Sequence, residues 1–272
     1  ATARRARGPP RTRGGHTPPP ARYGPLRDQA PGAAERAALR GMLHELSSRH
    51  VAIPLIIGGQ WTETGDRGEC RMPHAHGHLL GTYQKADVAA VNRAIAAATG
   101  ARESWSRMPW ESRAAIFLKA ADLIAGRRRA LVNASTMLGI SKTAHQAEVD
   151  AVCELVDFLR FNVSFMARIY GEQPLSPEGQ WNKMEWRPLE GFVFAVTPFN
   201  FTSIAGNLPA APALMGNTVV WKPASSAVYP AYVIMQILEE AGLPPGVINL
   251  VPGSGAAVGT PVLSHPGLAG LN

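Results

Sequence analysis

The sequence has little cysteine and no long hydrophobic run. Cys70 and Cys153 are the only cysteines among 272 residues, too few for a disulfide scaffold, and neither has the C-x-x-C spacing of a zinc or redox site. This scarcity favours a reducing compartment. No stretch reaches the roughly eighteen apolar residues of a membrane-spanning helix, so we expect a soluble protein with no membrane partner. At 46% hydrophobic residues, the chain can bury one large core or two modest ones.

Acidic residues are missing from the first 22 positions. The formal net charge is +7 at pH 7, and residues 1–22 contain six arginines and no Asp or Glu, so six of these seven charges lie in the tail. The nearly neutral remainder argues against a basic face that binds nucleic acid. The tail alone has the charge to contact phosphates without reading sequence. We therefore expect no specific nucleic-acid partner.

Pro, Gly and Arg dominate residues 1–32. Such a composition buries too little apolar surface to offset the entropy of ordering, so we predict a disordered Arg/Pro-rich tail. The Arg-rich, acid-poor composition is also typical of a mitochondrial transit peptide. However, six prolines precede Asp28, and the tail has no amphipathic stripe. We expect a cytoplasmic protein, with the mitochondrial matrix as the alternative.

Residues 33–170 have mainly helical periodicity. A short strand is predicted at 52–57, closed by the Gly58-Gly59 turn. Asp87 has the character of a helix N-cap, and Gly126 is placed to end a later helix. The predicted helices cover residues 33–48, a segment from Asp87, residues 111–126 and residues 143–169.

The chain changes character after residue 170. Residues 171–190 have turn chemistry at 176–179 between two runs that could pair as a projecting hairpin, which we interpret as an oligomerisation arm. Residues 191–272 then alternate short apolar strands with helices, which predicts a βαβαβ core. Apolar runs of this kind are typical of parallel strands buried on both faces. The predicted fold class is α/β, with a helical N-terminal region and an open parallel Rossmann-like sheet.

Ligands of such sheets bind beyond the carboxyl ends of the strands, and three loops there carry candidates. TPFNF places Asn200 after the first strand, where an amide could donate to an oxyanion or simply form a turn. TVVWKPAS places Lys222 within reach of a ribose or phosphate, or at a sheet edge as a snorkelling lysine. VPGSGAAVG resembles a phosphate loop only weakly, since its spacing is one residue too long and no acidic residue follows. Its glycines could serve helix packing alone.

Two further groups of polar residues have a simpler interpretation. His74, His76 and His78 would share one face of a strand as metal ligands. No carboxylate or thiolate lies nearby, and Pro73 and Gly77 indicate a loop, so we predict no metal site. Asp150, Glu154 and Asp157 share a helix face, which is usually just a solvated face.

The combination LEGFVFAVTPFNFTSIAGNLPAAPALMGNTVVWKPAS and AGLPPGVINLVPG resembles the cofactor-binding half of the aldehyde dehydrogenase superfamily. FNFT, NLPAAPALMGN and QAEVDAVCELVDFLRFN are similar to its glutamate-semialdehyde, or 1-pyrroline-5-carboxylate, dehydrogenase branch, which acts in proline breakdown. The resemblance covers residues 33–272. It implies NAD-dependent oxidation of L-glutamate γ-semialdehyde to L-glutamate, in which a Cys thiolate attacks the aldehyde and hydride passes to NAD.

The resemblance also implies roles for particular residues. Asn200 is the oxyanion donor, and Thr197 lies along the nicotinamide side of the cofactor. Lys222 binds the adenosine ribose, Gly255 lies under the adenine end, and Glu154 is near the aldehyde entrance. Many relatives have a Glu at the position of Ser225, where it binds both ribose hydroxyls and repels a 2′-phosphate. We expect NAD, and Ser225 leaves NADP open.

The family's F-T-G-S loop, catalytic Glu and nucleophilic Cys have no counterpart in residues 1–272. Neither Cys70 nor Cys153 is a substitute, so we expect this chain alone to be inactive, truncated before the catalytic domain. Two alternatives remain: a dehydrogenase of another small aldehyde such as succinic semialdehyde, and a non-catalytic nucleotide-binding remnant. When full length, the enzyme would act on a small aldehyde as a homo-oligomer.

Overall fold

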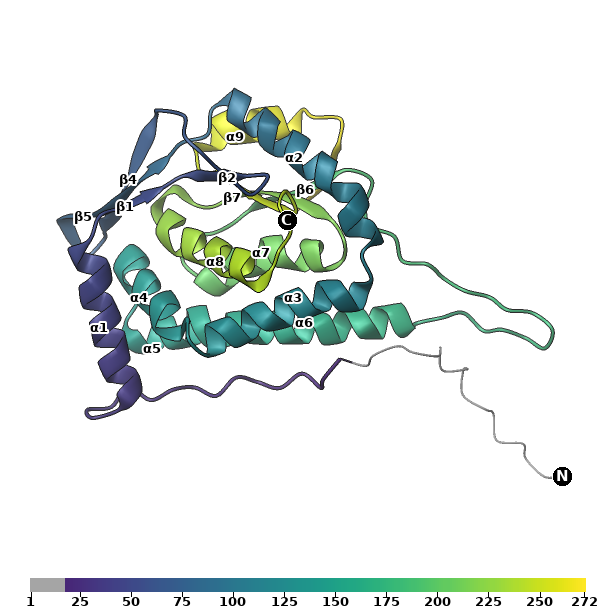
Figure 1. The fold of residues 1–272 in the computed structure, drawn as a ribbon, viewed down its shortest axis with the longest axis horizontal. Coiled ribbons are helices and arrows are strands. Elements are labelled where there is room, and N and C mark those ends of the chain that lie inside the picture. Colours follow the sequence, from purple (N-terminus) through teal and green to yellow (C-terminus); the bar gives the residue numbers. More distant parts are fainter. Residues whose placement is uncertain (1–17) are drawn as a thin grey trace.

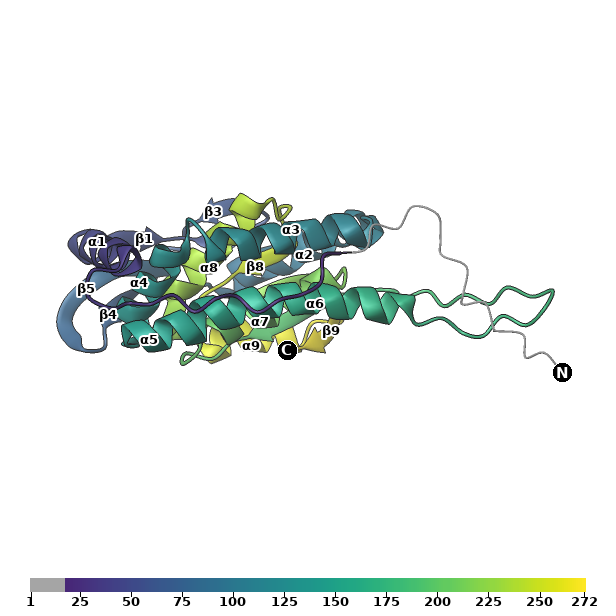
Figure 2. The same cartoon turned by 90° about the horizontal axis from the view of Figure 1, so that it is seen from below.

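The computed structural model describes residues 18–272, so the prediction of a disordered tail lies outside the described residues for positions 1–17. The rest forms two β-sheets with helices packed around the larger one (Figures 1 and 2). None of the helices in residues 18–272 combines the length and apolar character that a membrane span requires.

Most of the strands are short. They are β1 (Val51–Ile53), β2 (Leu55–Ile57), β3 (Gln60–Thr62), β4 (Arg67–Met72), β5 (Ala75–Gln84), β6 (Phe192–Val196), β7 (Thr218–Lys222), β8 (Ile248–Leu250) and β9 (Leu268–Leu271). The helices include one π-helical segment, η1, and one 3-10 turn, η2. They are α1 (Ala34–Ser48), α2 (Val88–Arg107), α3 (Trp110–Ala125), α4 (Arg129–Ile140), α5 (Ala144–Ala147), η1 (Glu148–Cys153), α6 (Glu154–Gly171), α7 (Thr202–Leu214), η2 (Ser225–Ala227), α8 (Val228–Ala241) and α9 (Gly255–Leu263).

The larger sheet has the strand order β3-β2-β8-β7-β6-β9. Strands β8, β7, β6 and β9 are parallel, which confirms the predicted βαβαβ core. Strands β2 and β3 form an antiparallel hairpin through the predicted Gly58-Gly59 turn, and β2 runs antiparallel to β8. The sheet is therefore mixed at one edge rather than parallel throughout.

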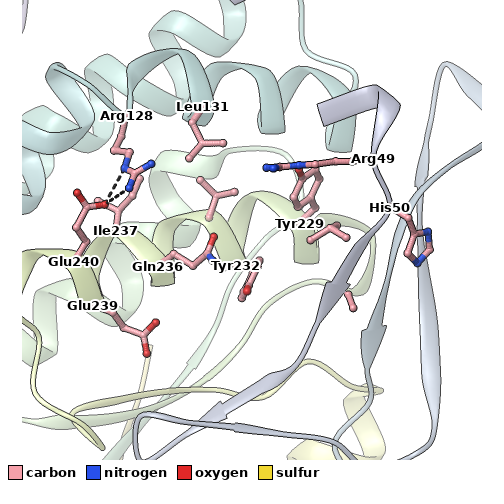
Figure 3. Close-up of a pocket in the computed structure, with 13 residues that line it drawn as sticks. Arg49, His50, Arg128, Leu131, Tyr229, Tyr232, Gln236, Ile237, Glu239 and Glu240 are labelled. Carbon is pink, nitrogen blue, oxygen red and sulfur yellow. Dashed lines mark hydrogen bonds and ion pairs between the residues drawn. The ribbon is translucent and has the colours of Figure 1, made fainter. Parts of the chain in front are cut away.

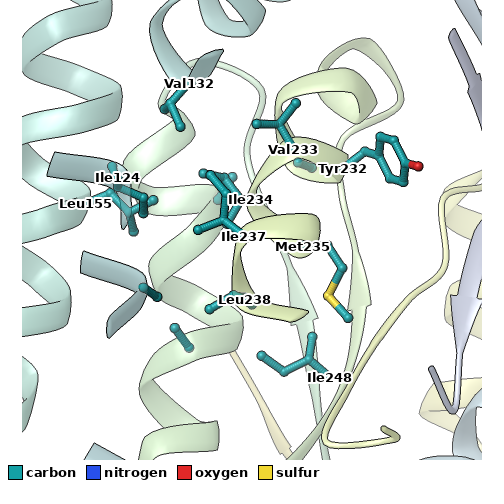
Figure 4. Packing of buried hydrophobic residues seen from close by; sticks show 14 of the residues in the cluster. Ile124, Val132, Leu155, Tyr232, Val233, Ile234, Met235, Ile237, Leu238 and Ile248 are labelled. Atoms are coloured by element: carbon teal, nitrogen blue, oxygen red, sulfur yellow. The ribbon is translucent and has the colours of Figure 1, made fainter. Parts of the chain in front are cut away.

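Helices cover both faces of this sheet, as the apolar strands require. In β6, Phe192 and Phe194 pack with buried residues of α2 and α9, whereas Val193 and Ala195 belong to the cluster that contains residues of α3, α6, α7 and α8. These two groups of helices lie on opposite sides of the sheet (Figure 1). In that second layer, Ile234 of α8 lies among Ile124, Leu155 and other buried aliphatic side chains (Figure 4). The two layers hold the carboxyl ends of β6, β7 and β8 at one edge.

Residues 51–84 form strands and turns. The strand expected at 52–57 is confirmed as β1 and β2, and the expectation of a mainly helical region is wrong for the strands that follow it. Strands β1, β5 and β4 form a second sheet. In β4, exposed and buried residues alternate, which is the pattern of a half-buried strand. Strand β5 contains His76 and His78, and this corrects the loop predicted around them.

The long helix predicted at 143–169 is divided into three parts. Thr143 caps the short α5 through a capping box with Gln146. The π-helical segment η1 follows, and α6 begins only at Glu154. Helix α4, which precedes them, was not predicted. By contrast, the predicted N-cap Asp87 is confirmed, since its carboxylate accepts from the Ala90 amide at 2.7 Å.

Residues 172–190, here called the arm, run away from α6 and return (Figures 1 and 2). They contain no strand, so the predicted hairpin ladder is wrong. Side chains join the two runs instead: Gln173 Oε1 accepts from the Met184 amide at 2.9 Å, and Asn182 Nδ2 donates to the Leu175 carbonyl at 2.8 Å. Two prolines in the outgoing run supply no amide for a ladder.

Residues 18–32, here called the strap, are extended and lie along α6 (Figure 2). The Tyr23 ring packs against Phe161 with ring centroids 4.9 Å apart, and the Gly24 amide donates to Asp157 at 2.8 Å. The disorder predicted up to residue 32 therefore does not hold for the strap, because hydrogen bonds and an aromatic contact offset the entropy of ordering it.

Candidate functional site

Thr197 and Lys222, two of the predicted site residues, meet at the carboxyl edge of the sheet. Val196 of β6 pairs with Lys222 of β7, and the Thr197 amide donates to the Lys222 carbonyl at 3.1 Å. The Thr197 side chain is 3% exposed, and its hydroxyl accepts from Trp221 Nε1 at 3.0 Å. The backbone at this edge is therefore held rigidly by the sheet and by the indole.

Lys222 is buried, with only 8% of its surface exposed. Its ammonium donates to the carbonyl of Pro223 at 3.3 Å, and it forms no ion pair within residues 18–272. Burial lowers the pKa of Lys222 below its ordinary value of 10.5. A buried charge is normally paired, whereas this ammonium has only one carbonyl as a partner. Its remaining N–H donors are therefore free for oxygen atoms of a bound molecule.

The glycine loop after β8 adjoins the same edge. Ser225 Oγ donates to the Gly253 carbonyl at 3.4 Å. A Cβ on Gly253 would lie 2.8 Å from Val258, so this glycine permits close packing of the loop on α9. Gly255 begins α9. A Cβ added at Gly255 would have no neighbouring group within 4 Å. The space over the first turn of α9 is therefore open, and helix N-termini favour phosphate groups there.

Asn200 lies three residues beyond Thr197, in the loop between β6 and α7, and its side chain is exposed. The adjacent Phe199 is 61% exposed. On the other side of Asn200, the Lys142 ammonium lies 4.4 Å from the ring centroid of Phe201. Because β6 and β7 are parallel, the loop of Asn200 and the end of β7 at Lys222 lie at the same edge of the sheet.

Glu154, the predicted substrate residue, contacts the start of α7. Its Oε2 accepts from Ser203 Oγ at 2.8 Å, and Ser203 lies three residues beyond Asn200. The two acidic neighbours on this face are also engaged: Asp150 pairs with Lys142 at 2.7 Å, and Asp157 binds the strap. The sequence analysis interpreted this helix face as a solvated one, but all three acidic side chains on it have hydrogen-bond or ion-pair partners. Ser203 was not predicted as a site residue. The only signal for it in the sequence is its position directly after Thr202 in FNFTS.

Both cysteines have raised pKa values. Burial raises the pKa of Cys70, on β4, to about 12. Burial, with the nearby Glu148 carboxylate, also raises the pKa of Cys153. A nucleophilic cysteine needs a lowered pKa, and the raised pKa of each thiol is the opposite of that.

The histidines do not form a metal centre in the part of the chain that the structure describes, where no group of three or more potential ligands occurs. His74 Nδ1 instead lies 2.8 Å from Ser141 Oγ.

A cavity of about 670 Å³ lies elsewhere, between α8, α4 and β1 (Figure 3). Arg128 and Glu240 in its wall pair with each other at 2.7 Å. None of the six predicted site residues lines this cavity, so the candidate site is the open edge above the strand ends.

Comparisons with known proteins show which family the chain belongs to. Residues 61–272 match the aldehyde dehydrogenase family model. The mitochondrial Δ1-pyrroline-5-carboxylate dehydrogenase of Bos taurus is 49% identical over 241 residues, which cover 89% of this chain and 43% of that protein. The enzyme of the same name from Agaricus bisporus is 47% identical, over 93% of this chain and 47% of that protein. The chain thus spans about half the length of these curated relatives.

Solved structures give the same result. The Δ-pyrroline-5-carboxylate dehydrogenase of Mycobacterium tuberculosis, bound with NAD, is 51% identical with a TM-score of 0.93, over 95% of this chain and 49% of that one. A 1-pyrroline-5-carboxylate dehydrogenase from Thermus, also with bound NAD, is 32% identical with a TM-score of 0.86, over 94% of this chain and 50% of that one. The family match, the relatives and the strand-edge geometry together show that the chain belongs to the aldehyde dehydrogenase family.

Proposed function

We propose that this chain is the NAD-binding part of an enzyme that oxidises L-glutamate γ-semialdehyde to L-glutamate in proline breakdown. The observation that carries the proposal is Lys222, a buried ammonium without a carboxylate partner in residues 18–272, at the edge where Thr197 and the N-terminus of α9 also lie. The relatives named for this reaction support the substrate.

The residues present fit a dinucleotide. We place the adenosine ribose hydroxyls on Lys222 and the adenine end over Gly255, where no side chain fills the space. Thr197 borders the nicotinamide, and when bound, NAD supplies the acceptor for the hydride. Ser225 carries no charge that would repel a 2′-phosphate, so the preference for NAD over NADP is a proposal that rests on the NAD-bound relatives.

The aldehyde is proposed to lie beside Asn200, whose amide donates to the carbonyl oxygen as negative charge develops on it. Glu154 is proposed to stand at the aldehyde entrance. Ser203 orients one of its carboxylate oxygens, and the other is available to accept from the ammonium group of the substrate. These two residues would hold opposite ends of one small molecule.

The assembly is proposed to be a homo-oligomer in which the arm joins subunits. Leu175 and Trp181, at its tip, are 92% and 77% exposed, and exposed apolar side chains of this size mark interaction surfaces. Residues 191–272 are proposed as the cofactor-binding core, and residues 33–170 as the N-terminal part of the same domain, which is helical apart from the strands within residues 51–84. Both cysteines are free thiols, which supports the cytoplasm, with the mitochondrial matrix as the alternative.

Steady-state kinetics of the full-length polypeptide that carries residues 1–272 tests this proposal. NADH formation should be at least about tenfold faster, in kcat/KM, with glutamate γ-semialdehyde than with succinic semialdehyde, since the half-buried Glu154 carboxylate would pair with the ammonium of the first substrate and would be left unpaired by the second. A preference for succinic semialdehyde would refute the substrate. Binding of NAD without oxidation of either aldehyde would identify a nucleotide-binding remnant.

A further inference from the structure

Helix α4 carries three polar side chains on one face. Arg129, Asn133 and Thr136 follow one another at intervals of four and three residues, so they point the same way. Asn133 and Thr136 are 2% and 0% exposed. Burying polar groups is costly without partners, and here the partners belong to other elements.

The first partner is the carboxylate of Glu148, which opens η1 and is 1% exposed. It forms a salt bridge with Arg129 and accepts from Asn133 Nδ2 at 2.7 Å. It also accepts from the Arg27 amide of the strap at 2.8 Å. Burial raises the pKa of Glu148, but the hydrogen bonds from Arg129, Asn133 and Arg27 outweigh it and hold the pKa below its ordinary value.

The second partner is Thr202, the first residue of α7. Thr136 Oγ1 and Thr202 Oγ1 lie 2.9 Å apart in a buried hydrogen bond. The next residue, Ser203, donates to Glu154 at 2.8 Å. The end of the loop that carries Asn200 is therefore fixed to α4 on one side and to Glu154 on the other.

The segment η1 closes this arrangement. The Glu154 amide donates to the Val149 carbonyl, five residues earlier, so the turn is wider than an α-helical turn. A turn that holds one more residue than an α-helical turn changes the directions in which the side chains on its two sides point. Glu148 can then face α4 while Glu154 faces α7. A ring of contacts results, which runs from α4 through Glu148, η1, Glu154, Ser203 and Thr202 back to Thr136.

We propose that this ring sets the distance between Asn200 and Glu154, and that Thr136 and Glu148 are positioning residues for the aldehyde. The inference rests on the proposed function, in which Asn200 and Glu154 contact opposite ends of one substrate. Neither positioning residue touches that substrate. Thr136 acts through its hydrogen bond to Thr202. Glu148 acts through η1, the wide turn that connects it to Glu154.

The kinetic test compares three variants of the full-length polypeptide. Thr136→Val removes the hydroxyl at nearly constant volume, and Thr136→Ser restores it. Ser135→Ala is the matched control, because Ser135 is also 0% exposed but its hydroxyl donates only to Val132 of its own helix, at 3.1 Å.

Thr136→Val should lower kcat/KM for glutamate γ-semialdehyde about tenfold, because the buried hydroxyl of Thr202 loses its hydrogen-bond partner. The Kd for NAD should stay unchanged, since Lys222 and α9 lie outside the ring. Thr136→Ser should recover most of the activity, and Ser135→Ala should behave as wild type. Equal kinetics for Thr136→Val and Ser135→Ala would overturn the proposal, as would a parallel loss of NAD affinity.

Hydrogen exchange on the chain of 272 residues separates this inference from the proposed function. The Ala205 amide donates to the Phe201 carbonyl at 3.0 Å in the first turn of α7. Thr136→Val should speed its exchange about tenfold, and Ser135→Ala should not. Unchanged exchange would refute the ring even in an active enzyme. Faster exchange in a protein that oxidises no aldehyde would leave the ring standing and refute only the proposed reaction.

Discussion

Replacing Lys222 by Met removes the ammonium at the strand edge and keeps an apolar side chain of similar length. In the described structure this ammonium reaches only the Pro223 carbonyl. The substitution therefore breaks no ion pair seen within residues 18–272. Its effect on NAD should come from the donors lost to the adenosine ribose.

The expected loss follows from that contact. A hydrogen bond that involves a charged group contributes about 1.5–3 kcal/mol, which corresponds to a roughly ten- to hundredfold rise in Kd. Stability should not fall, because burial already disfavours the charged form of Lys222 and lowers its pKa. The Tm of Lys222→Met should equal or exceed that of wild type, since Met removes a buried charge.

Isothermal titration calorimetry with NAD, together with thermal unfolding, measures both quantities. Lys119→Met is the matched control, because Lys119 is an exposed lysine on α3 and is not one of the predicted site residues. It should leave the Kd unchanged. An unchanged Kd for Lys222→Met would refute the assignment of Lys222 to the ribose. A lower Tm together with weaker binding would show that Lys222 stabilises the fold instead.

Four more substitutions test other residues of the site and the fold. Asn200→Ala in the full-length polypeptide should lower kcat at least about a hundredfold, as loss of an oxyanion donor does; unchanged turnover would remove Asn200 from that role. Because the folded-state pKa of Glu148 is below its ordinary value of 4.5, its stabilising contribution is complete above pH 4.5 and is lost as pH falls through the folded-state pKa. Acid unfolding should therefore be shallower in Glu148→Gln than in wild type, and parallel curves would contradict this. Gly253→Ala should cost about 1–3 kcal/mol of unfolding free energy through its 2.8 Å contact with Val258, whereas Gly255→Ala should cost none; equal denaturant midpoints would refute the packing argument.

The Rossmann-like core could be predicted because each of its strands is an apolar run bounded by glycine or a turn. Topology then placed the loops of Asn200 and Lys222 at one edge without knowledge of any contact. The Asp87 cap was predictable for a similar reason, since a cap is a local hydrogen bond between neighbours in the sequence.

Features that depend on distant contacts could not be predicted. Strand β4 alternates polar and apolar residues, but it is short and its neighbour β5 is rich in Gly and His. The π-helical segment leaves no mark on hydrophobic periodicity, which averages over it. The strap is held by distant partners, since Asp157 and Glu148 accept from its amides and Phe161 packs against Tyr23, all more than a hundred residues away.

The unpredicted helix α4 did carry a signal. Its sequence RALVNASTMLGI places three polar residues on one face of a mostly apolar helix, and such residues need buried partners. The sequence could therefore have indicated a polar network, although not that Glu148 and Thr202 complete it.

The structure of this protein with bound NAD is the most direct test of the central claim. Lys222 Nζ should lie within hydrogen-bond distance of an adenosine ribose hydroxyl, with the adenine end over Gly255 and the nicotinamide beside Thr197. A dinucleotide bound elsewhere, or bound at this edge with Lys222 still directed only at the Pro223 carbonyl, would contradict it.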